Sequence, residues 1–243
     1  MTSNKSTGPT LLAIDTAGSA CSVALGRGAV VLAAERRELR YGHSEALLPM
    51  IDRVMQAAAL ETAALDAVAV AVGPGGFTGI RVGLGAAHGI TLALQARLVG
   101  VTSFAAIISA LPDKTGTPGA VLVALDSRRD DLYVQLFDRP SAEPVTGPAA
   151  VLPEMLVDYV NAAAGAAPLL IAGDAADAAA AVLRDHFDVE IAADSAPDAR
   201  GVLLAGLHQF ARDPAGSGAR PLYLRPPDVT LAKRRDPAAA ARR

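Results

Sequence analysis

The chain has 243 residues, of which 22 are basic and 25 acidic, so its formal net charge is -3. This charge gives no overall attraction to nucleic acid, and the single cysteine, Cys21, excludes an internal disulfide or a zinc site built from several cysteines. The polar opening lacks the apolar segment of a signal peptide, and glycine, arginine or histidine interrupts the longest apolar stretches. We therefore predict a cytoplasmic α/β protein with no membrane contact.

The first part of the chain reads as three strands, a helix, a strand, a second helix and another strand. These elements are expected over residues 10–16, 19–28, 29–39, 44–59, 66–72, 77–95 and 98–101. The hairpin between the second and third strands is expected to turn at Arg27 and Gly28, and Ser44 is expected to cap the first helix.

The second part repeats the opening theme. A strand that ends in an aspartate and is followed by an outgoing strand occurs at residues 10–16, with Asp15, and again at residues 120–128, with Asp126. Helices over 151–164, 174–186 and 198–212 alternate with short strands at 169–173 and 189–193. We predict two related domains, each a mixed sheet flanked by helices. The expected N-terminal domain covers residues 1–103 and the C-terminal domain 104–213, and residues 214–243 are expected to pack back on the first.

A glycine-proline loop at residues 73–79, GPGGFTG, separates the strand at 66–72 from the helix at 77–95. A Walker loop needs lysine and Ser or Thr after its last glycine, but Ile80 and Arg81 follow Gly79 here, and a dinucleotide fingerprint would need glycine where Thr78 stands. Those two phosphate motifs are excluded. The candidates for a remaining nucleotide contact are Asp15, Gly75, Gly76, Thr78 and Asp126.

The helix at 77–95 contains two pairs of glycines four residues apart, Gly79 with Gly83 and Gly85 with Gly89. Each interior glycine costs roughly 0.5–1 kcal/mol relative to alanine. Close packing against another helix is the simplest compensation. The helix at 44–59 has a wide apolar arc, which could serve the domain core or a partner. The candidate partner-interface residues on the two helices are Leu47, Leu48, Ile51, Val54, Met55, Gly79, Arg81, Gly83, Leu84 and His88.

We assign no catalytic or metal-binding residue from the sequence. The four histidines have no spacing typical of metal ligands, and the segment GHSEA at 42–46 lacks the final glycine of a hydrolase nucleophile elbow. Asp15 and Asp126, each at the end of a strand, are candidates for magnesium or phosphate contacts, with turn capping as the alternative. The basic tail at 230–243 reads as a solvated end or as a contact to phosphate or an acidic partner.

Six segments in register resemble the bacterial TsaB family, the partner subunit of the complex that makes threonylcarbamoyladenosine (t6A) in tRNA. They are LLAIDTAGSACSVAL, GHSEALLPMI, AVAVGPGGFTGIRVGLGAAHGI, VGVTSF, VALDSRRDDLYV and PLYLR, and they extend over nearly the whole chain. The resemblance implies an actin-like, sugar-kinase/Hsp70-type fold with two domains.

The resemblance also implies a non-catalytic subunit that dimerises with and activates TsaD, the paralogue that modifies the adenosine beside the anticodon. TsaD carries an HxxxH metal pair at positions that match Ser103 and Ile107 here, and these residues cannot form that site. The helices at 44–59 and 77–95 are expected to dock the paralogue, or to form a homodimer in its absence. A TsaE-like ATPase is expected to join, with ATP or ADP at the subunit junction, and tRNA is contacted only through the complex.

Two alternative functions stay open from the sequence. An ATP-dependent phosphotransferase would suit the same fold, although Gly173 alone represents a glycine-rich adenosine loop in the second half. A peptidase would need a metal site or an activated nucleophile, and the sequence shows no pattern for either. The chain itself is expected to require no cofactor.

Overall fold

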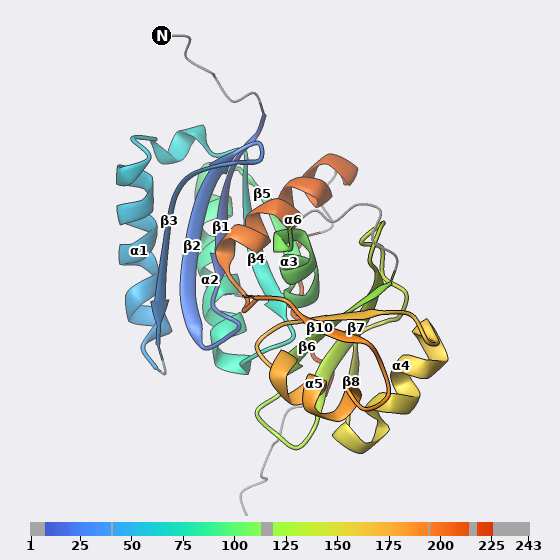
Figure 1. Cartoon of the computed structure of the whole chain (residues 1–243). Helices are drawn as coiled ribbons and strands as arrows, with labels where there is room; N and C mark the ends of the chain where they lie inside the picture. Colours follow the sequence, from blue (N-terminus) through green and yellow to red (C-terminus); the bar gives the residue numbers. More distant parts are fainter. Residues whose placement is uncertain (1–7, 40, 113–118, 194, 214–217, 226–243) are drawn as a thin grey trace, which may run out of the picture.

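We describe a computed structural model of the chain, which covers residues 8–39, 41–112, 119–193, 195–213 and 218–225. Two mixed sheets flanked by helices form the body of the molecule (Figure 1). The tail at 230–243, for which we expected a solvated end, lies outside the described residues.

The first sheet has the strand order β3-β2-β1-β4-β5. Its strands are β1 (Thr10–Asp15), β2 (Ala20–Arg27), β3 (Val30–Glu38), β4 (Ala67–Gly73) and β5 (Arg97–Thr102). β1 pairs with β2 in antiparallel and with β4 in parallel orientation. β1 and β4 are buried along their whole length, which explains their uninterrupted apolar sequences, because helices cover both faces of the sheet.

The second sheet repeats this arrangement, with the order β10-β9-β6-β7-β8. Its strands are β6 (Ala120–Asp126), β7 (Leu132–Asp138), β8 (Ala149–Val151), β9 (Leu169–Ala172) and β10 (Val189–Ile191). β6 occupies the place of β1, antiparallel to β7 and parallel to β9. The predicted pair of mixed sheets, each with a strand that ends in aspartate and is followed by an antiparallel strand, is therefore confirmed.

The helices form layers on the sheets. They are α1 (His43–Ala57), α2 (Phe77–Leu94), α3 (Ser103–Ala110), α4 (Leu156–Ala164), α5 (Ala176–Leu183) and α6 (Ala199–Arg212), with 3-10 turns η1 (Thr62–Ala64) and η2 (Pro153–Met155). α2 packs toward Val70 and α6 toward Ala69. Because neighbouring residues of a strand point to opposite faces, these two helices cover opposite faces of the first sheet.

Two sequence-based expectations need correction. We assigned residues 198–212 to the C-terminal domain, but α6 packs on the first sheet, and Ala199, Val202 and Leu203 belong to that sheet's core. Ser44 does not cap α1: the helix begins one residue earlier, Gly42 occupies the cap position with φ 86°, and the Ser44 hydroxyl donates to Glu45 instead.

Candidate functional site

The glycine loop lies against the turn between β1 and β2. The Gly76 amide donates to the carbonyl oxygen of Ala17 at 2.7 Å, and the Thr16 hydroxyl donates to the carbonyl oxygen of Gly79 at 2.7 Å. A Cβ atom on Gly79 would overlap the main-chain carbonyl of Thr16, and one on Gly75 would overlap that of Ala17. The loop is therefore rich in glycine because two segments of this chain's own backbone meet there.

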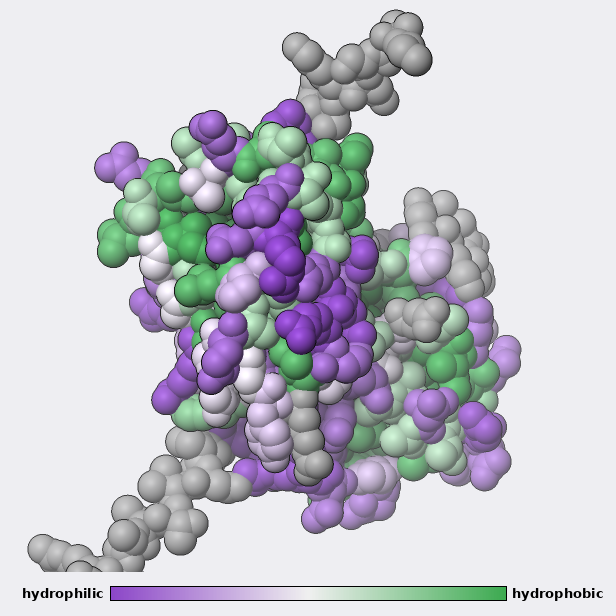
Figure 2. All heavy atoms as spheres, turned by 90° about the vertical axis from the view of Figure 1, so that its left-hand side faces the viewer, coloured by the Kyte–Doolittle hydropathy of each residue, from purple (hydrophilic) through white to green (hydrophobic). Residues whose placement is uncertain are grey.

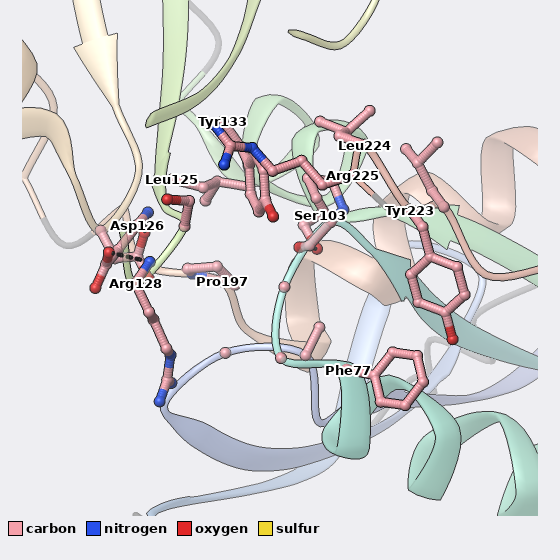
Figure 3. Close-up of a pocket in the computed structure, with 18 of the residues that line it drawn as sticks. Phe77, Ser103, Leu125, Asp126, Arg128, Tyr133, Pro197, Tyr223, Leu224 and Arg225 are labelled. Carbon is pink, nitrogen blue, oxygen red and sulfur yellow. Dashed lines mark hydrogen bonds between the residues drawn. The ribbon is translucent and has the colours of Figure 1, made fainter. Parts of the chain in front are cut away.

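A cleft of about 580 Å³ opens beside this loop. The β1–β2 turn and the glycine loop line one side, the turn between β6 and β7 lines the other, and residues 222–225 complete it. In Figure 3, Phe77 and Tyr223 lie beside each other at one end, and Asp126 and Arg128 lie at the other. This is the place where a nucleotide contact was predicted from the sequence.

Asp15 lies behind the cleft wall. Its side chain is 2% exposed, Oδ1 accepts the Ala17 amide at 2.9 Å, and Oδ2 is buried without a hydrogen-bond partner among the described residues. Burial raises the pKa of Asp15 to about 6, the Ala17 hydrogen bond opposes this rise, and the negative charges of Asp198 and Asp174 add to it. The carboxyl group is thus poorly solvated at neutral pH.

Asp126 lines the cleft and also holds a turn. Its Oδ1 accepts the Arg128 amide at 2.6 Å, and its own amide donates to Asp174 Oδ1 at 3.0 Å. Burial is the main cause that raises the pKa of Asp174. Asp15 and Asp126 therefore perform the same task, since each accepts the amide two residues further on, which is the turn-capping alternative considered above.

The predicted nucleotide-binding residues are only partly brought together. Gly75, Gly76 and Asp126 line the cleft, whereas Asp15 and Thr78 do not. The Gly76 amide is already bonded to Ala17, so this amide is not available to a phosphate oxygen. The described loop does not fit a phosphate group in the manner of a P-loop, in which several free amides converge on the anion.

The segment before the C-terminal tail lies in the stretch 214–243 that we expected to pack on the first domain, but its residues were not among the predicted site residues. The Leu222 amide donates to Val72 at 2.8 Å, the Tyr223 ring lies 5.3 Å from the Phe77 ring, and Arg225 forms an ion pair with Asp131 at 2.5 Å. The Asp131 side chain is fully buried. Residues 222–225 therefore tie the first sheet to the β6–β7 turn across the cleft. The alternation of apolar residues in PLYLR is the sequence signal that could have identified this segment.

The outer face of α2 differs from its inner face. A Cβ atom on Gly85 or Gly89 would meet no atom of the described residues within 4 Å, and Leu92 is 84% exposed. Arg81 and His88 are also exposed. These residues recur every three or four positions and therefore share one side of the helix. Seen from the α1 side of the molecule, hydrophobic residues gather at the upper left, beside a hydrophilic band (Figure 2).

Only part of the predicted interface set lies on this surface. Leu48, Arg81 and His88 are exposed. The structure places six others in the interior, which corrects the expectation that they form a surface: Leu47, Ile51, Val54, Met55, Gly83 and Leu84. Gly79 is half-buried and faces Thr16. The wide arc of α1 is explained by the core, because α1 packs its apolar side on β2 and β3.

Among the described residues, one helix, α2, is long and apolar enough to cross a membrane. This is weak evidence for a span, because helices of soluble cores meet the same criteria. Five of its residues are buried in this structure, namely Ile80, Gly83, Leu84, Ala87 and Thr91.

Ser103 and Ile107, which the resemblance matched to a metal pair, have structural roles. The buried Ser103 hydroxyl donates to the carbonyl oxygen of Pro74 at 2.8 Å, which fixes α3 to the glycine loop. Ile107 is 2% exposed and packs in the core between α3 and the second sheet. Neither side chain supplies a metal ligand in this arrangement.

Comparisons with known proteins connect the chain with proteins of tRNA threonylcarbamoyladenosine biosynthesis. A family model described as TsaD, tRNA N6-adenosine threonylcarbamoyltransferase, matches residues 37–204. The tRNA threonylcarbamoyladenosine biosynthesis protein TsaB of Escherichia coli K12 is 34% identical over 129 residues, 53% of this chain and 55% of that protein. The match thus spans about half the length of this curated relative. An uncharacterized protein of Mycobacterium tuberculosis H37Rv is 35% identical over 225 residues, 90% of this chain and 93% of that one.

Solved structures show the same fold. YeaZ from Pseudomonas aeruginosa has a TM-score of 0.71 at 28% identity and aligns with 89% of this chain and 100% of its own. An inorganic polyphosphate/ATP-glucomannokinase from Arthrobacter has a TM-score of 0.51 at 11% identity, over 85% of this chain and 100% of its own. At this low identity the kinase shows the fold alone, which is the predicted actin-like and sugar-kinase type.

Proposed function

Because the chain belongs to the TsaB family of tRNA threonylcarbamoyladenosine biosynthesis proteins, we propose that it is the non-catalytic subunit that dimerises with and activates a TsaD-like threonylcarbamoyltransferase. The exposed face of α2 carries this proposal. Gly85 and Gly89 have no internal contact that explains the absence of a side chain, unlike Gly79 and Gly83. Close approach of another backbone to that face would compensate their helix-propensity cost.

The proposed interface is centred on Gly85, Gly89 and Leu92, with Arg81 and His88 on the same side. The two glycines lie one helical turn apart, which allows the axis of a partner helix to come close, as in other contacts between small residues. Complete burial of the Leu92 side chain would contribute about 1.5–3 kcal/mol to the free energy of binding. Leu48 on α1, 55% exposed, is a further apolar residue of the proposed interface. A TsaD-like paralogue is the proposed partner, and a second copy of this chain takes its place when the paralogue is absent.

The absence of catalysis is proposed from two positions. By resemblance, Ser103 and Ile107 occupy the places of the paralogue's metal ligands. Ser103 instead donates a hydrogen bond to Pro74, and Ile107 packs in the core. In the complex, transfer of the threonylcarbamoyl group to the adenosine beside the anticodon would occur on the partner, and this chain would contact tRNA only through the complex. A TsaE-like ATPase with ATP or ADP at the subunit junction completes the proposed assembly, which we place in the cytoplasm.

The interface is tested by binding to the TsaD-like paralogue. Gly89→Leu places a large side chain in open space, so the monomer should keep its fold while the partner helix is displaced, and Leu92→Glu should act similarly through charge burial. Ala178→Leu on the exposed side of α5 is the matched control. Calorimetric titration should show at least tenfold weaker binding for the two α2 variants and unchanged binding for the control. Wild-type affinity in both α2 variants would contradict the proposed face.

A further inference from the structure

The exposed side of α2 begins with a cluster of three residues, Phe77, Arg81 and Tyr223. The Cζ atom of Arg81 lies 3.8 Å from the centre of the Phe77 ring, and Arg81 Nε donates to the Tyr223 hydroxyl oxygen at 3.3 Å. The Phe77 and Tyr223 side chains lie beside each other at one end of the cleft (Figure 3), and the two residues are 41% and 39% exposed. Two aromatic side chains therefore hold the guanidinium group at the surface of the molecule.

Tyr223 is itself fixed by the residues on either side of it. The Leu222 amide donates to the carbonyl oxygen of Val72 at 2.8 Å, and Arg225 forms an ion pair with the buried Asp131. These contacts keep the Tyr223 hydroxyl beside the guanidinium group. An arginine that is restrained in this way loses less conformational entropy when it binds an anion than a freely rotating one.

The guanidinium group has no anionic partner within the described part of the chain. Arg81 forms no ion pair there, and its two terminal nitrogens have no hydrogen-bond acceptor among the described residues. The eighteen residues of α2 include no aspartate, glutamate or lysine, so Arg81 is the one residue of this helix with a formal charge. Binding to an RNA backbone takes several phosphate contacts, whereas one arginine can orient a protein partner through a single carboxylate.

We propose that Arg81 binds one aspartate or glutamate side chain of the TsaD-like paralogue through its two terminal nitrogens, while Phe77 and Tyr223 hold the guanidinium plane in place. This inference rests on the proposed function, because it names the chemistry by which the α2 face selects its partner. Further along this side of the helix, the two exposed glycines and Leu92 offer small and apolar contacts, which are non-directional. One pair of opposite charges at the beginning of the helix fixes the alignment of the partner.

Calorimetric titration of the full chain with the TsaD-like paralogue, at about 0.05 M and about 0.5 M salt, tests this carboxylate site. Arg81→Gln should weaken binding about tenfold at the lower salt concentration and remove most of the salt dependence. Arg81→Lys keeps the charge but loses the planar fork and should weaken binding about threefold. Tyr223→Phe keeps the ring and removes the acceptor of Nε, so it should weaken binding about twofold through lost pre-organisation.

Charge reversal identifies the carboxylate of the partner. Arg81→Glu should weaken binding about a hundredfold, and arginine in place of one particular exposed Asp or Glu of the paralogue should restore most of the lost affinity. Arg184→Glu reverses an exposed arginine of the segment after α5 and is the matched control, which should leave binding unchanged. Circular dichroism verifies the fold of each variant.

The outcomes separate this inference from the proposed function. Unchanged affinity of Arg81→Gln, in the assay in which Leu92→Glu weakens binding, would overturn the carboxylate site and leave the proposed α2 face intact. Unchanged affinity of both variants would contradict the face itself. If Arg81→Gln binds the paralogue normally but lowers the affinity of the assembled complex for tRNA, Arg81 contacts a phosphate group and the proposal is wrong.

Discussion

Gly83 and Gly85 lie two residues apart in α2, and alanine at these positions should have opposite effects on stability. In a helix interior, alanine is favoured over glycine by roughly 0.5–1 kcal/mol, and this gain is common to both substitutions. A Cβ on Gly85 enters open space, whereas one on Gly83 would lie 2.5 Å from the Thr16 hydroxyl oxygen. That hydroxyl is buried and bonded to Gly79, so Thr16 must rotate and abandon the bond.

Loss of the buried Thr16 hydrogen bond costs about 1–3 kcal/mol. The free energy of unfolding should therefore rise by roughly 0.5–1 kcal/mol in Gly85→Ala and should be about 1–3 kcal/mol lower in Gly83→Ala than in Gly85→Ala. Urea denaturation followed by circular dichroism measures both values. In a Thr16→Ala background the obstacle is gone, and Gly83→Ala should then stabilise as much as Gly85→Ala. Equal effects of the two glycine substitutions in the wild-type background would refute this division of the helix.

Three other predictions concern charges and a hydrogen bond. The raised pKa of Asp15, about 6 against 3.8, means that between these values the folded chain holds a proton that the unfolded chain has lost. Stability should therefore fall as pH rises through this window, and Asp15→Asn should flatten the denaturation profile between pH 4 and 7. Arg225→Met leaves the buried Asp131 without its cation and should lower the free energy of unfolding by about 2 kcal/mol. Adding Asp131→Asn should restore part of this loss. Because Arg225 is 37% exposed, an unchanged melting temperature would show that solvent already screens the ion pair. Thr16→Val should lower stability by about 1 kcal/mol, and a neutral effect in thermal melts would show that the bond to Gly79 is unimportant.

The sequence predicted the architecture well because its signals are local. The apolar strands, the hairpin at Gly28 and the repeated strand-aspartate-strand pattern depend on neighbouring residues, and the structure confirms them. Helical periodicity identified α1 and α2, but it could not separate the buried arc from the exposed side. Ile51 and Met55 are buried in the core because α1 packs on the first sheet.

Contacts between segments far apart in the chain could not be predicted from the sequence. The return of α6 to the first sheet, the hydrogen bond of Gly76 to Ala17, and the pairing of Arg225 with Asp131 join residues that lie at least 59 positions apart in the chain. No local pattern fixes such partners. The four glycines of α2 looked alike in sequence, and only the structure shows that two pack against the chain's own backbone and side chains while two face open space among the described residues.

The central claim is that this chain activates a TsaD-like transferase and performs no transfer itself. Incorporation of radiolabelled threonine into tRNA, with the TsaD-like subunit, the TsaE-like ATPase, the enzyme that forms the threonylcarbamoyl adenylate, and ATP, tests it directly. We predict that incorporation is lost when this chain is omitted, that the chain without the TsaD-like subunit gives none, and that Gly89→Leu restores far less than the wild-type chain. Undiminished incorporation in the absence of the chain, or incorporation by the chain without the TsaD-like subunit, would contradict the account.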